Sequence, residues 1–264
     1  MTKLCELFSD EAFGFRLKLR RGSLAEFFSP SEAHSRIIAE RRRWLEAAPE
    51  NYLAESKLSP ALWSELAATI KQPIDPSDDR MALTAGSTLE PDIVFLQRDA
   101  TGKFRLTDGV VVFPTGWALP EKIGLTLAET HGVVPGLNAM IGDAIDRFLD
   151  QLKPGVAATR SNWGLAATNE LNLHPSVNRP RLDDNVTPDQ VWLRVEHQIL
   201  ALLPHTDAIV FGIRIELIPL SEVLTEPDAR SRLHRALDTM PATVARYKGL
   251  AQAMPSLLRM TSLN

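Results

Sequence analysis

The sequence predicts an α+β fold, in which an antiparallel sheet of about five strands carries inserted helices and has helical extensions at both ends. Strand-like segments occur first as a pair and later as a group of three, with helical segments between the two groups. Because strands and helices do not alternate one for one, a doubly wound parallel sheet is disfavoured. The 264 residues are 44% hydrophobic and 23% charged, which is enough to build a substantial core.

Residues 1–80 are expected to form a helical N-terminal extension. Apolar side chains recur at helical spacing over residues 35–46. Pro60 begins a second helix, because proline suits the first turn. The run Arg41-Arg42-Arg43 is expected to be a solvated helix face rather than a binding patch. A break rich in proline and aspartate follows at residues 73–79.

The next segments predict a strand pair and then two helices. Residues 92–97 form a β-type run, Thr101-Gly102 a turn, and residues 103–113 the returning strand. Residues 120–129 are expected to form one short helix. Residues 135–152 are expected to form a longer helix, which Lys153-Pro154-Gly155 ends.

Three further strands and a helical tail complete the chain. Residues 156–168 are a strand candidate, followed by a polar loop at residues 172–189. Residues 191–202 alternate in their first half and residues 208–217 alternate throughout, as expected of a hairpin with one buried face. Residues 225–264 are expected to form a C-terminal helical segment.

This order of elements is the one seen in PAS-type sensor domains, whose ligand lies between the sheet and the inserted helices. We therefore expect residues 90–220 to form a PAS-like core within a single domain of residues 1–264. The expectation rests on analogy of fold and does not by itself assign a function.

Charge and cysteine content narrow the classes of function. The net charge of −4 gives no general attraction to nucleic acid, and no apolar run is long enough to span a membrane. Residues 1–10 lack the pattern of a secretory signal, so a cytoplasmic protein is expected. Cys5 is the single cysteine, and one thiol cannot hold an iron–sulfur cluster or a cysteine-rich zinc site. A bound metal would need histidine, carboxylates or a porphyrin.

A set of short motifs runs in order through the middle of the chain. They are Phe113-Pro-Thr-Gly-Trp117, Lys122-Ile-Gly124, His131-Gly-Val-Val-Pro135-Gly136, Arg160-Ser-Asn-Trp163, Leu193-Arg-Val-Glu-His-Gln198, Leu203-Pro204 and Ile209-Val-Phe211-Gly-Ile-Arg214. Taken together, they resemble the haem-dependent oxidative N-demethylase family, whose catalytic subunit binds haem b in a PAS-like domain. The resemblance covers most of the chain and is densest from Phe113 to Pro219.

The resemblance implies a haem-dependent oxidoreductase. The implied reaction oxidises a secondary or tertiary alkylamine with O2 and releases formaldehyde. Electrons would come from NADPH through a flavin- and iron–sulfur-containing reductase, which must be a separate polypeptide because Cys5 stands alone. A haem- or gas-sensing PAS-like module without turnover, and a PAS-like scaffold that has lost haem, are the alternatives.

His131 is the expected axial ligand of the iron under this resemblance. Neutral imidazole is a usual axial donor, and a rigid Pro135-Gly136 turn lies close by. The alternative role is a histidine that caps a helix. His174, on the polar loop, is the rival ligand. His197 is disfavoured, because the family commonly has arginine at that position.

Arg160 and Trp163 follow the longer predicted helix on one strand. Arg160 is a candidate catalytic residue, since it can donate charge-assisted hydrogen bonds to a bound oxygen ligand or to a haem propionate. Trp163 is a candidate for packing on the porphyrin. Their alternative roles are a solvated arginine and an ordinary core tryptophan.

Arg194 and Glu196 share one face of the next strand, because side chains alternate with a period of two. Such a pair is commonly an ion pair of little energetic value. If the face lines the pocket, Glu196 is the candidate that holds the alkylammonium and accepts its proton. Arg194, Lys122 and Trp117 are candidate haem-binding residues.

Overall fold

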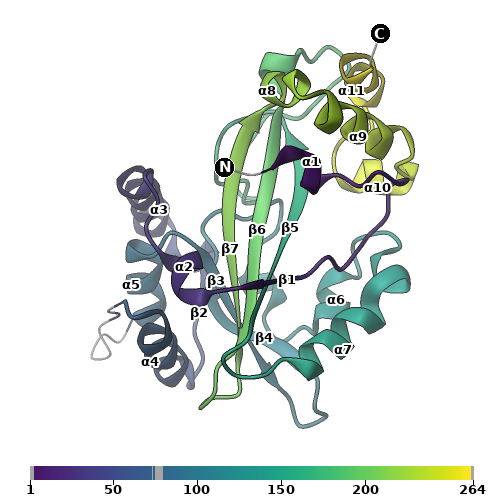
Figure 1. Ribbon diagram of the computed structural model, residues 1–264. Helices are drawn as coiled ribbons and strands as arrows, with labels where there is room; N and C mark the ends of the chain where they lie inside the picture. Colours follow the sequence, from purple (N-terminus) through teal and green to yellow (C-terminus); the bar gives the residue numbers. More distant parts are fainter. Residues whose placement is uncertain (1–2, 73, 75–79, 263–264) are drawn as a thin grey trace.

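The strands form one antiparallel sheet in the computed structural model, which describes residues 3–72, 74 and 80–262. Its order is β1-β5-β6-β7-β3-β4-β2 (Figure 1). The strands are β1 (Arg20–Gly22), β2 (Leu53–Ala54), β3 (Asp92–Arg98), β4 (Phe104–Val110), β5 (Ala157–Ala166), β6 (Trp192–Leu202) and β7 (Ile209–Pro219). The α+β class and the antiparallel sheet are thus confirmed, with seven strands among the described residues instead of about five.

The five long strands have the PAS order. Numbered by their appearance in the chain, they lie second, first, fifth, fourth and third across the sheet. The inserted elements are η2 (Pro120–Lys122), α6 (Leu127–His131), η3 (Asn138–Gly142) and α7 (Asp143–Gln151). They lie on one side of the sheet in Figure 1. Strands β3 to β7 span residues 92–219, close to the expected core.

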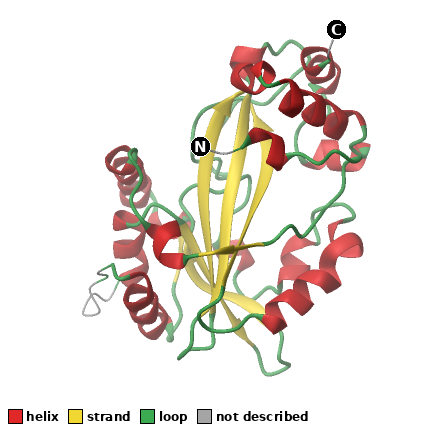
Figure 2. Ribbon diagram, in the orientation of Figure 1, coloured by secondary structure: helices red, strands yellow, loops and turns green. Residues whose placement is uncertain are grey.

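The N-terminal extension is not purely helical, contrary to the prediction. Its helices are α1 (Leu4–Leu7), α2 (Leu24–Phe28), α3 (His34–Ala47), η1 (Pro49–Asn51) and α4 (Ser59–Ile70). It also supplies β1 and β2, which form opposite edges of the sheet. Figure 2 distinguishes the strands of the sheet from the surrounding helices by colour. Strands of two or three residues are too short to show an alternating pattern. The predicted break at residues 73–79 lies outside the described residues, apart from residue 74.

The two inserted helices differ from their predicted extents. The expected helix at residues 120–129 is divided into η2 and α6, because Gly124 adopts a left-handed φ of 82° between them. The expected helix at residues 135–152 begins with the π-helical turn η3 and continues as α7. Helix α5 (Met81–Thr88) precedes β3 and had no sequence prediction.

The C-terminal segment is helical, as expected. It contains α8 (Leu220–Thr225), α9 (Pro227–Asp238), α10 (Ala242–Tyr247) and α11 (Met254–Thr261), and the short η4 (Pro188–Gln190) precedes β6. These helices and α1 cover one end of the long strands (Figure 1). No described helix has both the length and the apolar character needed to cross a membrane.

Alternation in the second half of β6 divides its side chains between two cores. Ile199 and Ala201 belong to the core that includes α4 and α5. Leu200 and Leu202 lie on the opposite face, with Ile145 of α7. Over residues 199–202 of β6, parity therefore decides whether a side chain faces the N-terminal helices or the inserted helices.

Arg41 is fully buried, which contradicts the prediction that Arg41-Arg42-Arg43 is a solvated face. Only Arg42 and Arg43 are exposed. Arg41 lies three residues after Ile38 and four before Leu45, so it shares their buried side of α3. Its Nη1 donates to Asp92 Oδ1 at 2.7 Å, and its Nε donates to the Gly86 carbonyl oxygen at 2.7 Å.

Asp92 connects this buried arginine to the Phe113 motif. Its Oδ1 accepts the backbone N–H of Val112 at 2.7 Å, and its Oδ2 accepts that of Phe113 at 3.0 Å. The carboxylate is 2% exposed and is thus satisfied on both oxygens by buried donors. Helix α3, strand β3 and the start of the motif are held together at this point.

Arg41→Met is expected to lower the free energy of unfolding by about 3–5 kcal/mol, because it leaves the Asp92 carboxylate buried without its cation. Urea denaturation measures this change. Arg36→Met is the matched control, since it makes the same substitution at an exposed position of α3. Equal midpoints for the two variants would show that the buried pair does not stabilise the fold.

Candidate functional site

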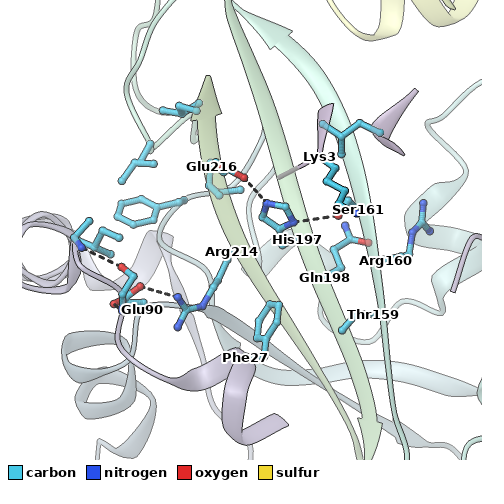
Figure 3. A pocket seen from close by; sticks show the side chains of 18 of the residues that line it. Lys3, Phe27, Glu90, Thr159, Arg160, Ser161, His197, Gln198, Arg214 and Glu216 are labelled. Atoms are coloured by element: carbon cyan, nitrogen blue, oxygen red, sulfur yellow. Dashed lines mark hydrogen bonds and ion pairs between the residues drawn. The ribbon is translucent and has the colours of Figure 1, made fainter. Parts of the chain in front are cut away.

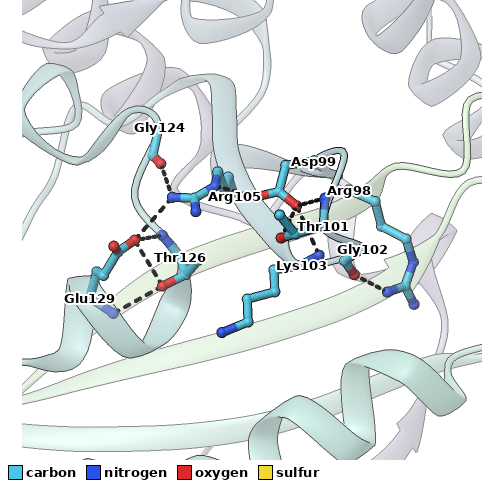
Figure 4. Close-up of polar contacts among 9 residues, drawn as sticks. All are labelled: Arg98, Asp99, Thr101, Gly102, Lys103, Arg105, Gly124, Thr126 and Glu129. Carbon is cyan, nitrogen blue, oxygen red and sulfur yellow. Dashed lines mark hydrogen bonds and ion pairs between the residues drawn. The ribbon is translucent and has the colours of Figure 1, made fainter.

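Helix α6 is fastened to the sheet by Arg105 of β4 (Figure 4). Arg105 Nη1 donates to the Gly124 carbonyl oxygen at 2.7 Å and to Glu129 Oε2 at 3.1 Å. Its Nε donates to Asp99 Oδ2 at 2.5 Å, in the β3–β4 turn. Since His131 is the last residue of α6, these contacts fix its backbone relative to β4.

The start of α6 is closed by a capping box. The Thr126 side chain accepts the N–H of Glu129 at 3.2 Å, and the Glu129 carboxylate accepts the backbone N–H of Thr126 at 2.7 Å. Glu129 thus both caps the helix and accepts a hydrogen bond from Arg105. These hydrogen bonds and the charge of Arg105 hold the pKa of Glu129 below its usual value, with the Thr126 backbone hydrogen bond the largest cause.

His131 has a buried Nδ1 atom that makes no hydrogen bond to any described residue. Burial lowers the pKa of His131, and the positive charge of Arg160 lowers it further. The imidazole is therefore neutral at pH 7 and keeps a nitrogen lone pair. An electron-pair donor without a partner is what a metal ligand requires.

Three further buried polar atoms near His131 also make no hydrogen bond within the described ranges. They are Thr130 Oγ1 of α6, Asn138 Oδ1 of η3 and Arg160 Nε of β5. Buried polar atoms in native proteins are nearly always hydrogen-bonded, so this group indicates a ligand that the chain does not supply. We call the region formed by Thr130, His131, Asn138 and Arg160 the α6–β5 site.

Large apolar side chains are exposed beside the same site. Val133, just after α6, and Met140, in η3, are each 58% exposed. Tyr247, at the end of α10, is 48% exposed. Apolar side chains of this size at a site with unsatisfied polar atoms favour a ligand with both apolar and polar parts.

The sheet contributes Arg160, Glu196 and Gln198 from one face. Arg160 lies opposite Gln198 in the β5–β6 pairing, so their side chains share a face with Glu196. Leu200 continues this face into the core that includes η3 and α7. Glu196 Oε1 accepts Thr115 Oγ1 at 2.6 Å, and its Oε2 accepts Gln198 Nε2 at 3.1 Å.

Arg194 is buried behind Glu196, with 2% exposure. Its Nε donates to Thr115 Oγ1 at 2.9 Å, and its Nη2 donates to the Phe113 carbonyl oxygen at 2.8 Å. Burial lowers the pKa of Arg194 to about 10, partly offset by Glu196 and Asp92. The guanidinium is still charged at neutral pH. The predicted Arg194–Glu196 pair is thus bridged by Thr115.

Positive charges outnumber negative ones around Glu196. Burial lowers the pKa values of Arg160 and Lys248, and Glu196 raises both again in part. Lys248 Nζ donates to the Trp163 carbonyl oxygen at 2.9 Å. With Arg194, three cations interact electrostatically with this one carboxylate.

The comparison with known families agrees with this chemistry. A family model described as haem-dependent oxidative N-demethylase, alpha subunit-like, matches residues 49–258, which is well over half of the chain. The chain belongs to this family. The matched region runs from η1 to α11 and contains His131, Arg160, Glu196 and Lys248.

Tyr247 and Lys248 are site residues that the sequence did not reveal. They follow Glu196 by about 50 positions and lie at the end of a short helix with no distinctive spacing. Burial raises the pKa of the Tyr247 phenol, and Glu196 raises it further. Tyr247 is therefore a protonated hydroxyl close to the carboxylate. Only the packing of the C-terminal segment on β5 brings these residues to the site.

Trp163 lies on the other face of β5 from Arg160. Three positions separate them, so their side chains point to opposite sides. The Trp163 ring meets Phe8 of α1 edge-on, with 5.1 Å between ring centroids, and belongs to the core of the C-terminal helices. This placement supports the core role for Trp163 and gives no support to packing on a porphyrin.

Trp117 and Lys122 lie on the segment that leads into α6. Trp117 is partly buried against the core that contains Ile141 and Ile145. Lys122 is the last residue of η2 and is partly exposed. Both precede His131 along the same connection, as the sequence motifs imply.

His174 belongs to a different cluster. Its Nδ1 lies 2.7 Å from Ser176 Oγ, and its ring meets Tyr52 edge-on at 5.2 Å. Asn172 Nδ2 donates a hydrogen bond to the Tyr52 hydroxyl at 2.9 Å. Although His174 Nε2 is buried without a described partner, its surroundings do not include Arg160. Of the two histidines, His131 is thus the one that interacts with Arg160.

His197 follows Glu196 directly on β6, so their side chains lie on opposite faces of the strand. Figure 3 shows His197 between Ser161 and Glu216. Its Nε2 lies 2.8 Å from Glu216 Oε2, and its Nδ1 lies 3.1 Å from Ser161 Oγ. This chain of contacts crosses β5, β6 and β7 in an open groove of about 980 Å³. Arg160 and Gln198 line the same groove.

Arg160→Met is expected to raise the pKa of His131 in the haem-free protein, because it removes a positive charge that opposes protonation. Histidine ring signals followed by NMR through a pH titration measure the change. Arg147→Met, at an exposed position of α7, is the control and should leave the titration unaltered. A His131 curve that does not move would separate Arg160 from the site.

Proposed function

We propose that this chain is the haem b-binding subunit of an oxidative N-demethylase and that His131 is the axial ligand of the iron. The observation that carries the proposal is the neutral, unpartnered His131 beside the buried Arg160, in a chain of this family. When bound, the haem supplies the redox and dioxygen chemistry that amine oxidation requires.

The residues present fit such a group. His131 offers an imidazole lone pair, and Val133 and Met140 offer apolar surface next to it. Arg160 has an unpartnered Nε that can donate to a propionate. Lys122 and Trp117 are proposed to bound the edge of the haem. Arg194 supports the site from behind, because its donors already serve Thr115 and Phe113.

Glu196 is proposed to bind the substrate, a secondary or tertiary alkylamine. At neutral pH such an amine arrives as an ammonium ion, and the carboxylate attracts it by charge. The nitrogen must lose its proton before it can be oxidised, and Glu196 is placed to accept that proton. The protonated Tyr247 and Gln198 complete the polar surroundings of the carboxylate.

The overall reaction balances with two electrons from outside the chain. One methylamine group, O2, two electrons and two protons give the demethylated amine, formaldehyde and water. We propose that a separate NADPH-dependent reductase with flavin and an iron–sulfur centre supplies the electrons, since the 264 residues contain one cysteine.

The purified protein is expected to bind haem and to show a Soret band, which His131→Ala abolishes. Visible spectroscopy after haem addition and removal of the excess measures it. His205→Ala is the control, because this histidine is exposed and lies on the β6–β7 connection. Loss of the band in His174→Ala, with retention in His131→Ala, would transfer the ligand role to His174.

Glu196→Gln is expected to weaken amine binding by about tenfold or more while haem remains bound, because the neutral amide cannot attract the ammonium ion or take its proton. Amine-induced shifts of the visible spectrum measure the affinity. Glu222→Gln, on the exposed side of α8, is the matched control.

Formaldehyde formed in one turnover tests catalysis directly. Reduced, haem-loaded protein is exposed to air with dimethylamine or trimethylamine, and formaldehyde is measured. Haem binding without formaldehyde from any amine would instead identify a haem- or gas-sensing module.

A further inference from the structure

Thr115, in the middle of the Phe113–Trp117 motif, joins two charged residues by hydrogen bonds. Its Oγ1 lies 2.9 Å from Arg194 Nε and 2.6 Å from Glu196 Oε1. These contacts are as short as strong charge-assisted hydrogen bonds. The proposed roles of His131 and Glu196 do not explain why a threonine lies between Arg194 and Glu196.

The direction of this chain is fixed by the chemistry of arginine. A guanidinium group has only donors, so Arg194 Nε–H must donate to Thr115 Oγ1. The single hydroxyl hydrogen of Thr115 is then available to be donated to Glu196 Oε1. Glu196 Oε1 must accept this hydrogen bond, and a proton on Oε1 would remove the acceptor.

The second oxygen of Glu196 is also committed as an acceptor. The Gln198 amide group donates to Oε2 at 3.1 Å. Each carboxylate oxygen therefore accepts one hydrogen bond from a neighbouring side chain, which fixes the orientation of the group. Its remaining lone pairs can accept only from a group that brings its own hydrogen, such as the N–H of an ammonium ion.

The backbone around Thr115 is held in place on both sides. Gly116 N–H donates to the Leu173 carbonyl oxygen at 3.0 Å, and Leu173 N–H donates to that of Pro114 at 3.2 Å. Gly116 has a φ of 73°, which a residue with a side chain adopts only with strain. The proline and glycine of the motif thus present Thr115 between Arg194 and Glu196.

We propose that Thr115 is a positioning residue for amine binding, which transmits the fixed hydrogen-bond direction of Arg194 to Glu196 and so makes the site select amines that carry an N–H. A quaternary ammonium ion has the charge but no N–H, and is therefore excluded. This inference rests on the proposed function, in which Glu196 binds the substrate.

Other charged and titratable groups face Glu196 and are left unaltered by a change at Thr115. They are Arg160 from β5, Arg194 from β6, and Tyr247 and Lys248 from the end of α10. A substitution of the hydroxyl alone therefore tests the hydrogen bond and not the net charge.

Thr115→Val removes the hydroxyl and keeps the shape. In the haem-loaded protein it is expected to raise the dissociation constant for trimethylamine about tenfold, which is the size of one hydrogen bond to a charged group. Thr115→Ser should restore the affinity to within about threefold, since it restores the hydroxyl. Thr107→Val, on β4, is the control. Equal affinities for Thr115→Val and the wild type would overturn the proposal.

Two comparisons exclude a merely structural role. In a Glu196→Gln background, Thr115→Val should change the affinity by less than about twofold, because its partner is already lost. Tetramethylammonium should bind the wild type far more weakly than trimethylamine does. Full additivity of the two substitutions, or tight binding of tetramethylammonium, would contradict the proposal.

A measurement on haem-free protein separates this inference from the proposed function. The side-chain carboxyl carbon of Glu196 is followed by carbon-13 NMR at pH 7. Thr115→Val is expected to shift its signal, because the hydrogen bond from the hydroxyl is lost, and Thr115→Ser is expected to return it. An unmoved signal overturns the role of Thr115 even where haem and amine bind. A moved signal without amine binding supports the hydrogen-bond chain and rejects the proposed function.

Discussion

The carboxylate of Asp92 is the point on which the arrangement of the site depends. Asp92 is the first residue of β3. Its carboxylate accepts hydrogen bonds from Arg41 of α3 and from the backbone N–H groups of Val112 and Phe113. The carbonyl oxygen of Phe113 in turn accepts a hydrogen bond from Arg194. Through this sequence of contacts the N-terminal helices, the middle of the sheet and the surroundings of Glu196 share one anchored region. The buried Asp92 carboxylate favours this arrangement, because both of its oxygens would lose buried hydrogen-bond donors in another one.

The site contains buried cations and polar atoms that have no partner among the described residues. Arg160, Arg194 and Lys248 all have pKa values lowered by burial, so the folded chain holds cations in an environment that disfavours them. His131, Thr130, Asn138 and Arg160 have polar atoms without described partners. Such local conflicts are typical of binding sites, where a ligand rather than the chain completes the interactions.

The periodicity of apolar residues made much of the fold predictable from the sequence. Very short strands, and contacts between residues far apart in the chain, were not predictable. Alternation correctly placed Arg194 and Glu196 on one face of β6, and it also contained the information that Trp163 opposes Arg160. Strands β1 and β2 are too short for any period to appear. Arg41 was misassigned because charge was weighed above its spacing from Ile38 and Leu45. Lys248 reaches the site only through packing of a distant helix, which no local pattern reports.

The two edge strands have a consequence for the behaviour of the sheet toward other chains. Strand β1 pairs with three residues of β5, and β2 pairs with two residues of β4. An edge strand of this length offers few free backbone groups in a row, so it is a poor template for another strand to add to. The N-terminal extension thus covers residues 157–159 on the β5 edge and residues 109–110 on the β4 edge, and shields these parts of the sheet from the edge-to-edge association that leads to aggregation.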